Sequence, residues 1–271
     1  RKQGLITGTL SLALFFYKRP HLGIADAWFV GSQSAEGPNW KVAYDGYLDF
    51  YHLPILHKNT FGPDYSNKAI YDAWGPHQRV SSPDHRTEAL AKYDEDDWTT
   101  EQLTMGVWTI FPHTSVAGFK VELPEEMDVP NRDEHGGRMY MISTLFPGDT
   151  PDTSVTVQNF LAAFEVTPEI EPIIAAQQKF LLGVVRDEDY FTGNRIQRAV
   201  KTGAKTDFLF GRNEAGGQRF HGWVDRLVAA ETSDDFDHEF ARAERVFQRR
   251  SRSGTLRSDT HRTDTHRTDA V

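Results

Sequence analysis

The sequence of 271 residues contains no cysteine. Disulfide bonds, thiolate nucleophiles, zinc–thiolate sites and cysteine-ligated iron–sulfur clusters are therefore excluded within this chain. The lack of disulfides fits a reducing compartment, so we expect a cytoplasmic protein.

The sequence also lacks a long apolar run. A membrane-spanning helix needs about 20 consecutive apolar residues, and the best candidate, residues 5–16, is shorter and is interrupted by Thr and Gly. No small-residue cleavage site follows it, as a signal peptide would require. We therefore expect this run to be a strand or a connecting element. Residues 1–30 are interpreted as a connector or the remnant of a preceding domain, and no membrane partner is expected.

Positive charge is in deficit, since 30 Lys and Arg face 39 Asp and Glu, for a net charge of −9. Nucleic-acid binding needs a basic face, so no nucleic-acid partner is expected. Apolar material is abundant by contrast, with 38% hydrophobic and 12% aromatic residues. A wholly disordered chain is thereby excluded, and the length allows one large domain or two small ones.

The order of the expected secondary structure indicates an α+β fold. Segments 104–123, 138–146 and 154–166 are rich in β-branched and aromatic residues and are separated by turns, which predicts an antiparallel meander. A helical period follows from residue 170, where Thr167 is the expected N-cap and Pro168 the first helical residue. Further helices are predicted at about 189–200, 222–230 and 235–248.

From Ser251 onward the sequence has almost no apolar residues, and a five-residue unit at 260–264 repeats at 265–269. Such a segment has nothing to bury, so residues 251–271 are predicted to be a disordered tail of low complexity.

The densest cluster of reactive side chains lies in residues 39–57, where His52 and His57 are five apart and Asp49 precedes His52 by three. Imidazole and carboxylate are suitable ligands for divalent iron. Positions five apart on a regular helix differ by about 140°, but Pro54 distorts a helix and can let both rings meet. Asp49 and His52 share a helix face, so Asp49 can orient the His52 ring. Spacing alone also allows two ordinary surface histidines.

The run Asn39, Trp40 and Lys41, followed by the D-x-x-H-x4-H pattern of Asp49, His52 and His57, resembles the ligand motif of one known family. That family is the Rieske-type non-haem iron oxygenases, which hydroxylate aromatic rings, and the similarity is to the catalytic domain of their α subunit. The resemblance implies that His52 and His57 bind iron. It also implies that Asp49 connects the iron site to the Rieske cluster of a neighbouring subunit.

The third iron ligand of the family is an aspartate at the start of a downstream helix, in an E-D segment followed by a glutamine. Here Asp189 is the matching residue, with Asp187 as the alternative and Gln197 as the glutamine. A carboxylate favoured by the helix dipole would be the ordinary interpretation of Asp189. Residues 210–221 also resemble the end of these catalytic domains, so we place the catalytic iron domain at 31–250.

The resemblance implies a helix-grip, START-like fold in which an antiparallel sheet packs against a long C-terminal helix. It implies an enzyme that uses Fe(II) and dioxygen to hydroxylate or dihydroxylate a small, aromatic or related organic substrate. A reductase or ferredoxin would supply electrons, and a homotrimer is expected. The family's [2Fe–2S] cluster has no ligands in this chain, so the isolated chain is expected to be inactive or incomplete, either by truncation or as a separate catalytic half.

Two other functions remain open at the level of sequence. One is a catalytically silent helix-grip module that binds an apolar ligand, and the other is a zinc-dependent hydrolase that uses the same triad, since zinc binds such donors tightly. Four other histidines are expected to have surface or structural roles, namely His77, His85, His113 and His135, and His221 is expected to cap a helix.

Overall fold

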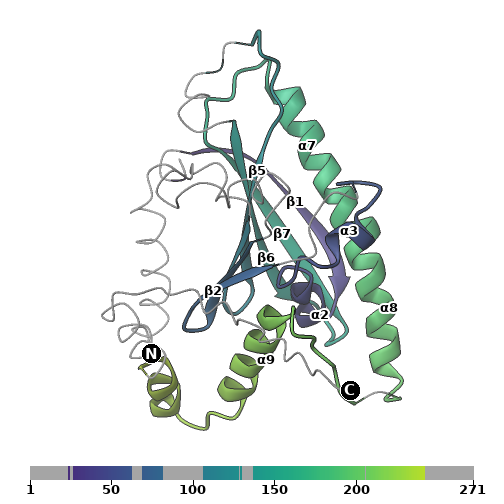
Figure 1. Ribbon diagram of the computed structural model, residues 1–271, viewed down its shortest axis with the longest axis vertical. Coiled ribbons are helices and arrows are strands. Elements are labelled where there is room, and N and C mark those ends of the chain that lie inside the picture. Colours follow the sequence, from purple (N-terminus) through teal and green to yellow (C-terminus); the bar gives the residue numbers. More distant parts are fainter. Residues whose placement is uncertain are drawn as a thin grey trace, which may run out of the picture.

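The computed structural model describes residues 24, 27–62, 69–81, 106–127, 129, 137–204 and 206–241. These residues form one antiparallel sheet and several helices, as expected for an α+β protein (Figure 1). Within these ranges, none of the helices combines the length and the apolar character that crossing a membrane requires. The apolar run 5–16 and the tail 251–271 lie outside the described residues.

The sheet has seven strands in the order β1-β7-β6-β5-β4-β3-β2, and every neighbouring pair is antiparallel. The predicted meander is confirmed in its later part, where the segments at 138–146 and 154–166 correspond to two long strands. Segment 104–123 was expected as one strand but is a hairpin with a turn at 111–113. The bounds are β1 Trp28–Pro38, β2 Ile70–Trp74, β3 His77–Ser81, β4 Gly106–Ile110, β5 Thr114–Lys120, β6 Arg138–Pro147 and β7 Thr153–Ala162.

Strands β1, β2 and β3 were not predicted from the sequence. Strand β1 contains Gly31 and a run of polar residues, so it lacks the apolar alternation that marks a strand. It forms because β7 pairs with it along almost its whole length, from Trp28 opposite Ala162 to Pro38 opposite Thr153. Long-range pairing has therefore overridden a weak local preference.

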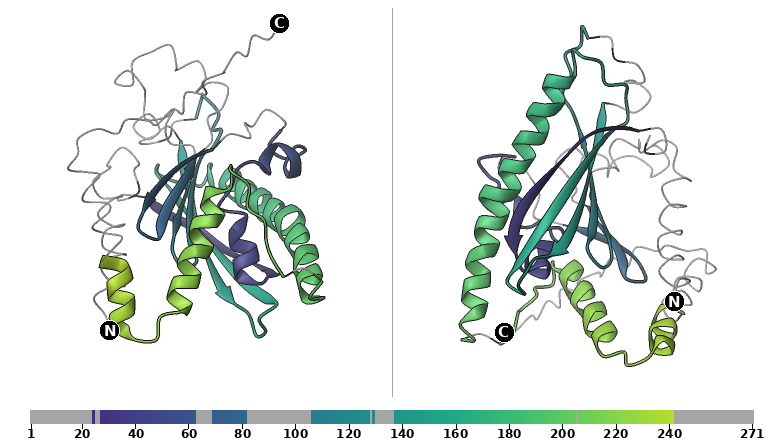
Figure 2. Two further views of the ribbon diagram at one scale, coloured as in Figure 1. Left: turned by 60° about the horizontal axis from the view of Figure 1, so that its bottom comes forward. Right: turned by 180° about the vertical axis from the view of Figure 1, so that it is seen from behind.

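One continuous helical stretch runs along one side of the sheet (Figure 1; Figure 2, right). It consists of α7 (Glu171–Val184), the π-helical turn η3 (Val185–Asp189) and α8 (Tyr190–Lys201). The two helices predicted here are confirmed, but they are joined rather than separate. The predicted N-cap Thr167 is wrong: α7 begins at Glu171, and the Thr167 carbonyl accepts backbone hydrogen bonds from Ile170 and Glu171 in a preceding turn.

Two short helices follow β1, namely α2 (Trp40–Asp45) and α3 (Leu53–Leu56). The Asn39 side chain accepts a hydrogen bond of 2.9 Å from the backbone N–H of Lys41 and so caps α2. The distortion expected at Pro54 takes the form of a new helix, because Pro54 lies in the first turn of α3, where its missing N–H is not needed. His52 and His57 thus flank one turn of helix instead of sharing a longer one.

Helix α9 (Ala215–Val228) begins earlier than the predicted 222–230, and a further helix is described over 233–241, which overlaps the predicted 235–248 and begins two residues before it. The Phe220 ring of α9 packs 4.9 Å from the Tyr44 ring of α2. At Gly216 an added Cβ would lie 2.2 Å from the Leu48 carbonyl oxygen. Helix α9 therefore rests directly on the turn that leads from α2 to His52.

We predict that Gly216→Ala destabilises the protein by about 1–3 kcal/mol, because the new methyl group must push α9 off the Leu48 backbone. Gly222→Ala on the same helix is the matched control, since its Cβ would meet no atom within 4 Å. It should stabilise the protein by about 0.5–1 kcal/mol through helix propensity. Urea denaturation of both variants measures the difference, and equal effects at the two positions would contradict the close packing.

Candidate metal centre

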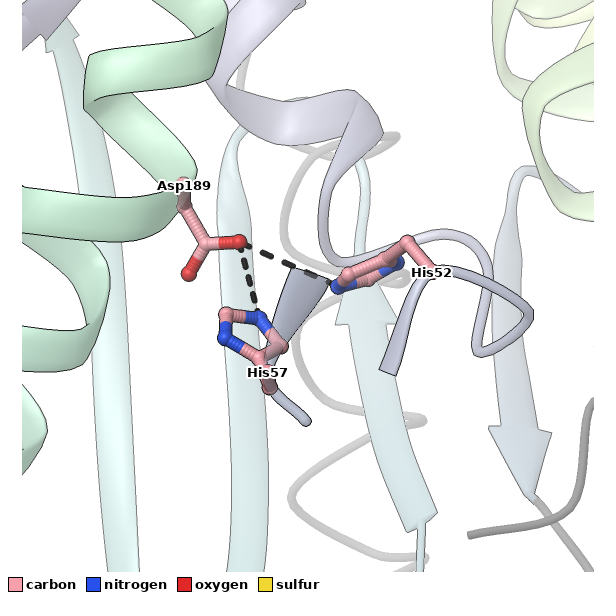
Figure 3. A group of neighbouring side chains, drawn as sticks. All are labelled: His52, His57 and Asp189. Atoms are coloured by element: carbon pink, nitrogen blue, oxygen red, sulfur yellow. Dashed lines mark ion pairs between the residues drawn. The ribbon is translucent and has the colours of Figure 1, made fainter. Parts of the chain in front are cut away.

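Three side chains with metal-binding atoms come together beside the helical stretch: His52, His57 and Asp189 (Figure 3). Their candidate ligand atoms all lie within 4.8 Å of one another. The Asp189 Oδ1 atom is 3.1 Å from His57 Nε2 and 3.8 Å from His52 Nε2. A metal ion with bonds of about 2.1 Å holds neighbouring ligand atoms at separations of this order, so the three atoms suit a single ion.

Local structure explains how residues so far apart in the sequence meet. His52 and His57 stand immediately before and after α3, and their ring centroids are 5.2 Å apart. Asp189 is the last residue of η3 and directly precedes α8. A π-helical turn changes the direction in which successive side chains point and is frequent at functional sites. Asp189 thereby faces the α3 turn across the gap between the two segments (Figure 3).

Both imidazole rings are oriented by a carboxylate on the nitrogen that faces away from Asp189. His52 Nδ1 lies 2.8 Å from Asp49 Oδ1, and His57 Nδ1 lies 2.6 Å from Glu188 Oε2. An Nδ1–H that donates to its carboxylate leaves Nε2 as the nitrogen of each ring that can bind a metal at the common point. The expectation that Asp49 and His52 interact is thus met.

Glu188 is the functional residue that the sequence did not single out. Besides His57, its Oε2 atom accepts a 3.0 Å hydrogen bond from the Thr60 hydroxyl. The neighbouring Asp187, the alternative ligand, is 58% exposed and forms an ion pair with Arg186, so the structure does not bring it to the group. Three consecutive acidic residues were visible in the sequence, but only the turn of η3 decides which carboxylate faces which atom.

The site is partly open to solvent. His57 is 2% exposed, whereas the side chains of His52 and Asp189 are 18% and 22% exposed. Burial acts to lower the pKa of His57, but the carboxylates of Asp189 and Glu188 outweigh it and raise the pKa above its ordinary value. For the Tyr47 hydroxyl, burial raises the pKa, and the negative charge of Asp189 raises it further.

The other histidines do not join this group in the described part of the chain. His221 was expected to cap a helix, and this prediction is wrong. It lies inside α9, and its Nε2 atom is 2.8 Å from Asp45 Oδ1, so it ties α9 to α2. Burial lowers the pKa of His77. His85 and His135 lie outside the described residues.

One family model matches most of the chain. Residues 26–121 and 134–230 match the model of the ring hydroxylating alpha subunit (catalytic domain). A search of curated proteins found no match.

Solved structures with a similar fold include the quaternary ammonium Rieske monooxygenase CntA in complex with the inhibitor MMV12. That comparison has 16% identity, covers 76% of this chain and 51% of that chain, and has a TM-score of 0.51. The CntA complex with L-carnitine has 17% identity, 79% and 51% coverage, and a TM-score of 0.51. At such identities the likeness concerns the fold, and this chain spans about half the length of those proteins.

In the metal-free protein we predict a His57 pKa above the ordinary value of about 6.5. A raised pKa means that the folded state binds the proton more tightly than the unfolded state. The resulting stabilisation is complete below about pH 6.5 and is lost as the pH rises through the folded-state pKa. NMR titration of the imidazole measures it, and Glu188→Gln should lower it. A wild-type value at or below 6.5 would show that the two carboxylates do not act as described.

Proposed function

The chain belongs to the ring-hydroxylating α-subunit family and contains its catalytic domain, and from this premise we propose that it is an oxygenase with a mononuclear non-haem Fe(II) site formed by His52, His57 and Asp189. The observation that carries the proposal is the convergence of two Nε2 atoms and one carboxylate oxygen on a common point. Two histidines and one carboxylate are the ligand set of non-haem iron oxygenases.

The residues around this triad prepare it for the metal. Asp49 and Glu188 each hold a proton on the far nitrogen of a ligand ring, so Nε2 is the atom that each ring turns toward the ion. Thr60 donates to Glu188 and keeps that carboxylate turned toward His57. When bound, Fe(II) supplies the binding and reductive activation of dioxygen, and the protein supplies orientation and shelter from water.

Electrons are proposed to come from a [2Fe–2S] cluster held outside this chain, because the sequence contains no cysteine to bind one. Asp49 is the proposed point of entry. Its Oδ1 atom accepts both the ring N–H and the backbone N–H of His52, and its side chain is still 17% exposed. A neighbouring subunit can therefore contact the same carboxylate. This role requires an oligomer, for which we propose a homotrimer with a reductase or ferredoxin as electron donor.

The fold is proposed to be of the helix-grip type, with the α7–η3–α8 stretch as the long helix against the sheet. The catalytic domain is proposed to occupy residues 31–250, of which the family model matches the greater part. The proposed reaction is hydroxylation of a small aromatic or related organic molecule. A silent binding module is disfavoured, because such a module has no need for three converging donors, two of which are oriented by further carboxylates.

We predict that Glu188→Ala weakens Fe(II) binding by about 10- to 100-fold, the usual effect of removing a group that orients a ligand histidine. Asp187→Asn is the matched control. Its carboxylate is next in sequence but points to Arg186, so affinity should not change. Asp189→Ala should remove binding almost completely. Anaerobic calorimetric titration of the full chain measures all three affinities, and an unchanged affinity in Asp189→Ala would refute the proposed triad.

A second prediction distinguishes the proposed oxygenase from a zinc-dependent hydrolase. The Fe(II)-loaded chain, supplied with a separate [2Fe–2S] electron donor and an aromatic substrate panel, should incorporate oxygen from isotopically heavy dioxygen, as seen by mass spectrometry. Without the donor we expect little turnover. Loading with zinc should abolish incorporation, because zinc has no redox chemistry. Hydrolytic products that take their oxygen from water, formed by the zinc-loaded chain, would instead favour the hydrolase.

A further inference from the structure

A row of polar side chains crosses the middle of the sheet on the face that carries the main core. The strand register places Gln33 opposite Gln158, Gln158 opposite Ser143, and Ser143 opposite Ser115. The row continues through Thr109 to Gln78. Side chains two residues away along a strand share the same face. Among them Met141, Leu145 and Phe160 belong to the main core, whereas Thr156 is a buried polar neighbour.

The outer members of the row have hydrogen-bond partners. Gln33 Nε2 donates to Gln158 Oε1 and to the Gln178 carbonyl, both at 2.9 Å. Gln78 Nε2 donates to the Gly216 carbonyl at 3.0 Å. The Thr109 hydroxyl donates to the Gln78 carbonyl at 3.3 Å. These contacts tie the two ends of the row to β1, α7 and α9.

The centre of the row is different. The hydroxyls of Ser115 and Ser143, the amide nitrogen of Gln158 and the hydroxyl of Tyr47 are all buried and make no hydrogen bond within the described part of the chain. The residues Ser115, Ser143 and Gln158 are each 0% exposed. A buried polar group without a partner is unfavourable, and apolar side chains of similar shape would be more stable here. Such local conflicts are typical of functional sites.

The unpartnered cluster lies next to the metal centre. The charge of Asp189 acts on the Tyr47 hydroxyl. The side chains of Ser143, Gln158 and Tyr190 surround this hydroxyl, although none of them meets it with hydrogen-bond geometry. Tyr190, the residue after Asp189, reaches the same sheet face, where its hydroxyl bonds to that of Thr156, two residues from Gln158 on β7. The cluster therefore occupies the layer between the sheet and the helix turn that holds Asp189.

We propose that Ser115, Ser143, Gln158 and Tyr47 form a binding site for the neutral oxygen-bearing group, such as a ketone carbonyl or a hydroxyl, of a small and otherwise apolar molecule. The amide nitrogen of Gln158 can only donate, so the ligand must accept a hydrogen bond. The neighbouring Asp189 carboxylate disfavours an anion. Taking this ligand to be the substrate rests on the proposed oxygenase function, whereas the binding itself needs no metal.

Tyr47 is the member that controls entry. The four atoms are enclosed in the structure, and three of them belong to central strands whose backbones are paired on both sides. Tyr47 lies instead in the turn between α2 and α3, outside the sheet. Its ring can turn aside without breaking strand pairing, so it can admit a ligand to the row and still contact the bound group through its hydroxyl.

Binding of three compounds of nearly equal shape to the full, metal-free chain tests the proposal. Acetophenone has a neutral carbonyl, α-methylstyrene replaces the oxygen with a methylene group, and benzoate carries a charge. Calorimetry should show that acetophenone binds at least about tenfold more tightly than either analogue, the effect of a hydrogen bond to otherwise unpartnered groups. Equal binding of acetophenone and α-methylstyrene, or no binding of acetophenone, would overturn the proposal.

Two serine variants separate recognition from stability. Ser143→Ala should reduce the preference for acetophenone while leaving the melting temperature unchanged or higher, because it removes an unpartnered buried hydroxyl. Ser154→Ala is the matched control. Ser154 is also buried, but its hydroxyl donates to the Pro38 carbonyl at 2.6 Å. This variant should lower the melting temperature and keep the preference.

A crystal structure with acetophenone provides the direct view. It should place the carbonyl oxygen within hydrogen-bond distance of the cluster, and ordered water alone at these atoms would overturn the proposal. Because the measurements use metal-free protein, a failure here leaves the iron-binding and oxygen-incorporation results intact. Equally, a failure to bind iron would leave the acetophenone preference measurable.

Discussion

The buried ring of His57 is the point on which the site depends. Two consecutive carboxylates contact its two nitrogens, with Glu188 2.6 Å from Nδ1 and Asp189 3.1 Å from Nε2. Consecutive residues of a regular helix point about 100° apart, and the π-helical turn η3 is where this chain departs from that regularity. Because of this turn, Glu188 can orient the His57 ring from one side while the next residue, Asp189, supplies the third metal-binding group on the other side. His52 repeats the arrangement, with Asp49 2.8 Å from its Nδ1 atom and Asp189 3.8 Å from its Nε2 atom.

The rest of the fold holds these segments in place. The ten-residue pairing of β1 with β7 fixes the start of α2, and α8 packs against β1 closely enough that a Cβ at Gly193 would meet Pro38 at 2.9 Å. Helix α9 presses on the turn after α2 through Gly216 and is tied to α2 by the His221–Asp45 pair. Hence the turn that carries Asp49 and His52 is confined between the sheet, α8 and α9, although it has little regular structure of its own.

The sheet face beneath the site shows a compromise between stability and recognition. Most of its inward-facing positions are apolar and fully buried, as in Met139, Leu145 and Phe160. The central row instead keeps hydroxyl and amide groups that lack partners in the described residues. Because such groups lower stability unless something binds them, their position beside Asp189 is best explained by recognition of a ligand. The same sheet therefore serves as core and as binding surface.

The chemistry of the site follows from the amino-acid sequence alone, through the donor types, the spacing around Pro54 and the absence of cysteine ligands. The later strands and helices also follow from it, because their local periodicity is strong. Tertiary structure decided what depends on contacts between distant segments. Strand β1 is too polar to be recognised without its partner β7. Glu188 could not be told from Asp187, because their directions are set by the π turn. The polar row forms only because the strand register aligns residues up to 125 positions apart, as with Gln33 and Gln158. Local sequence cannot predict this register, because the same alternation of side chains occurs in every strand.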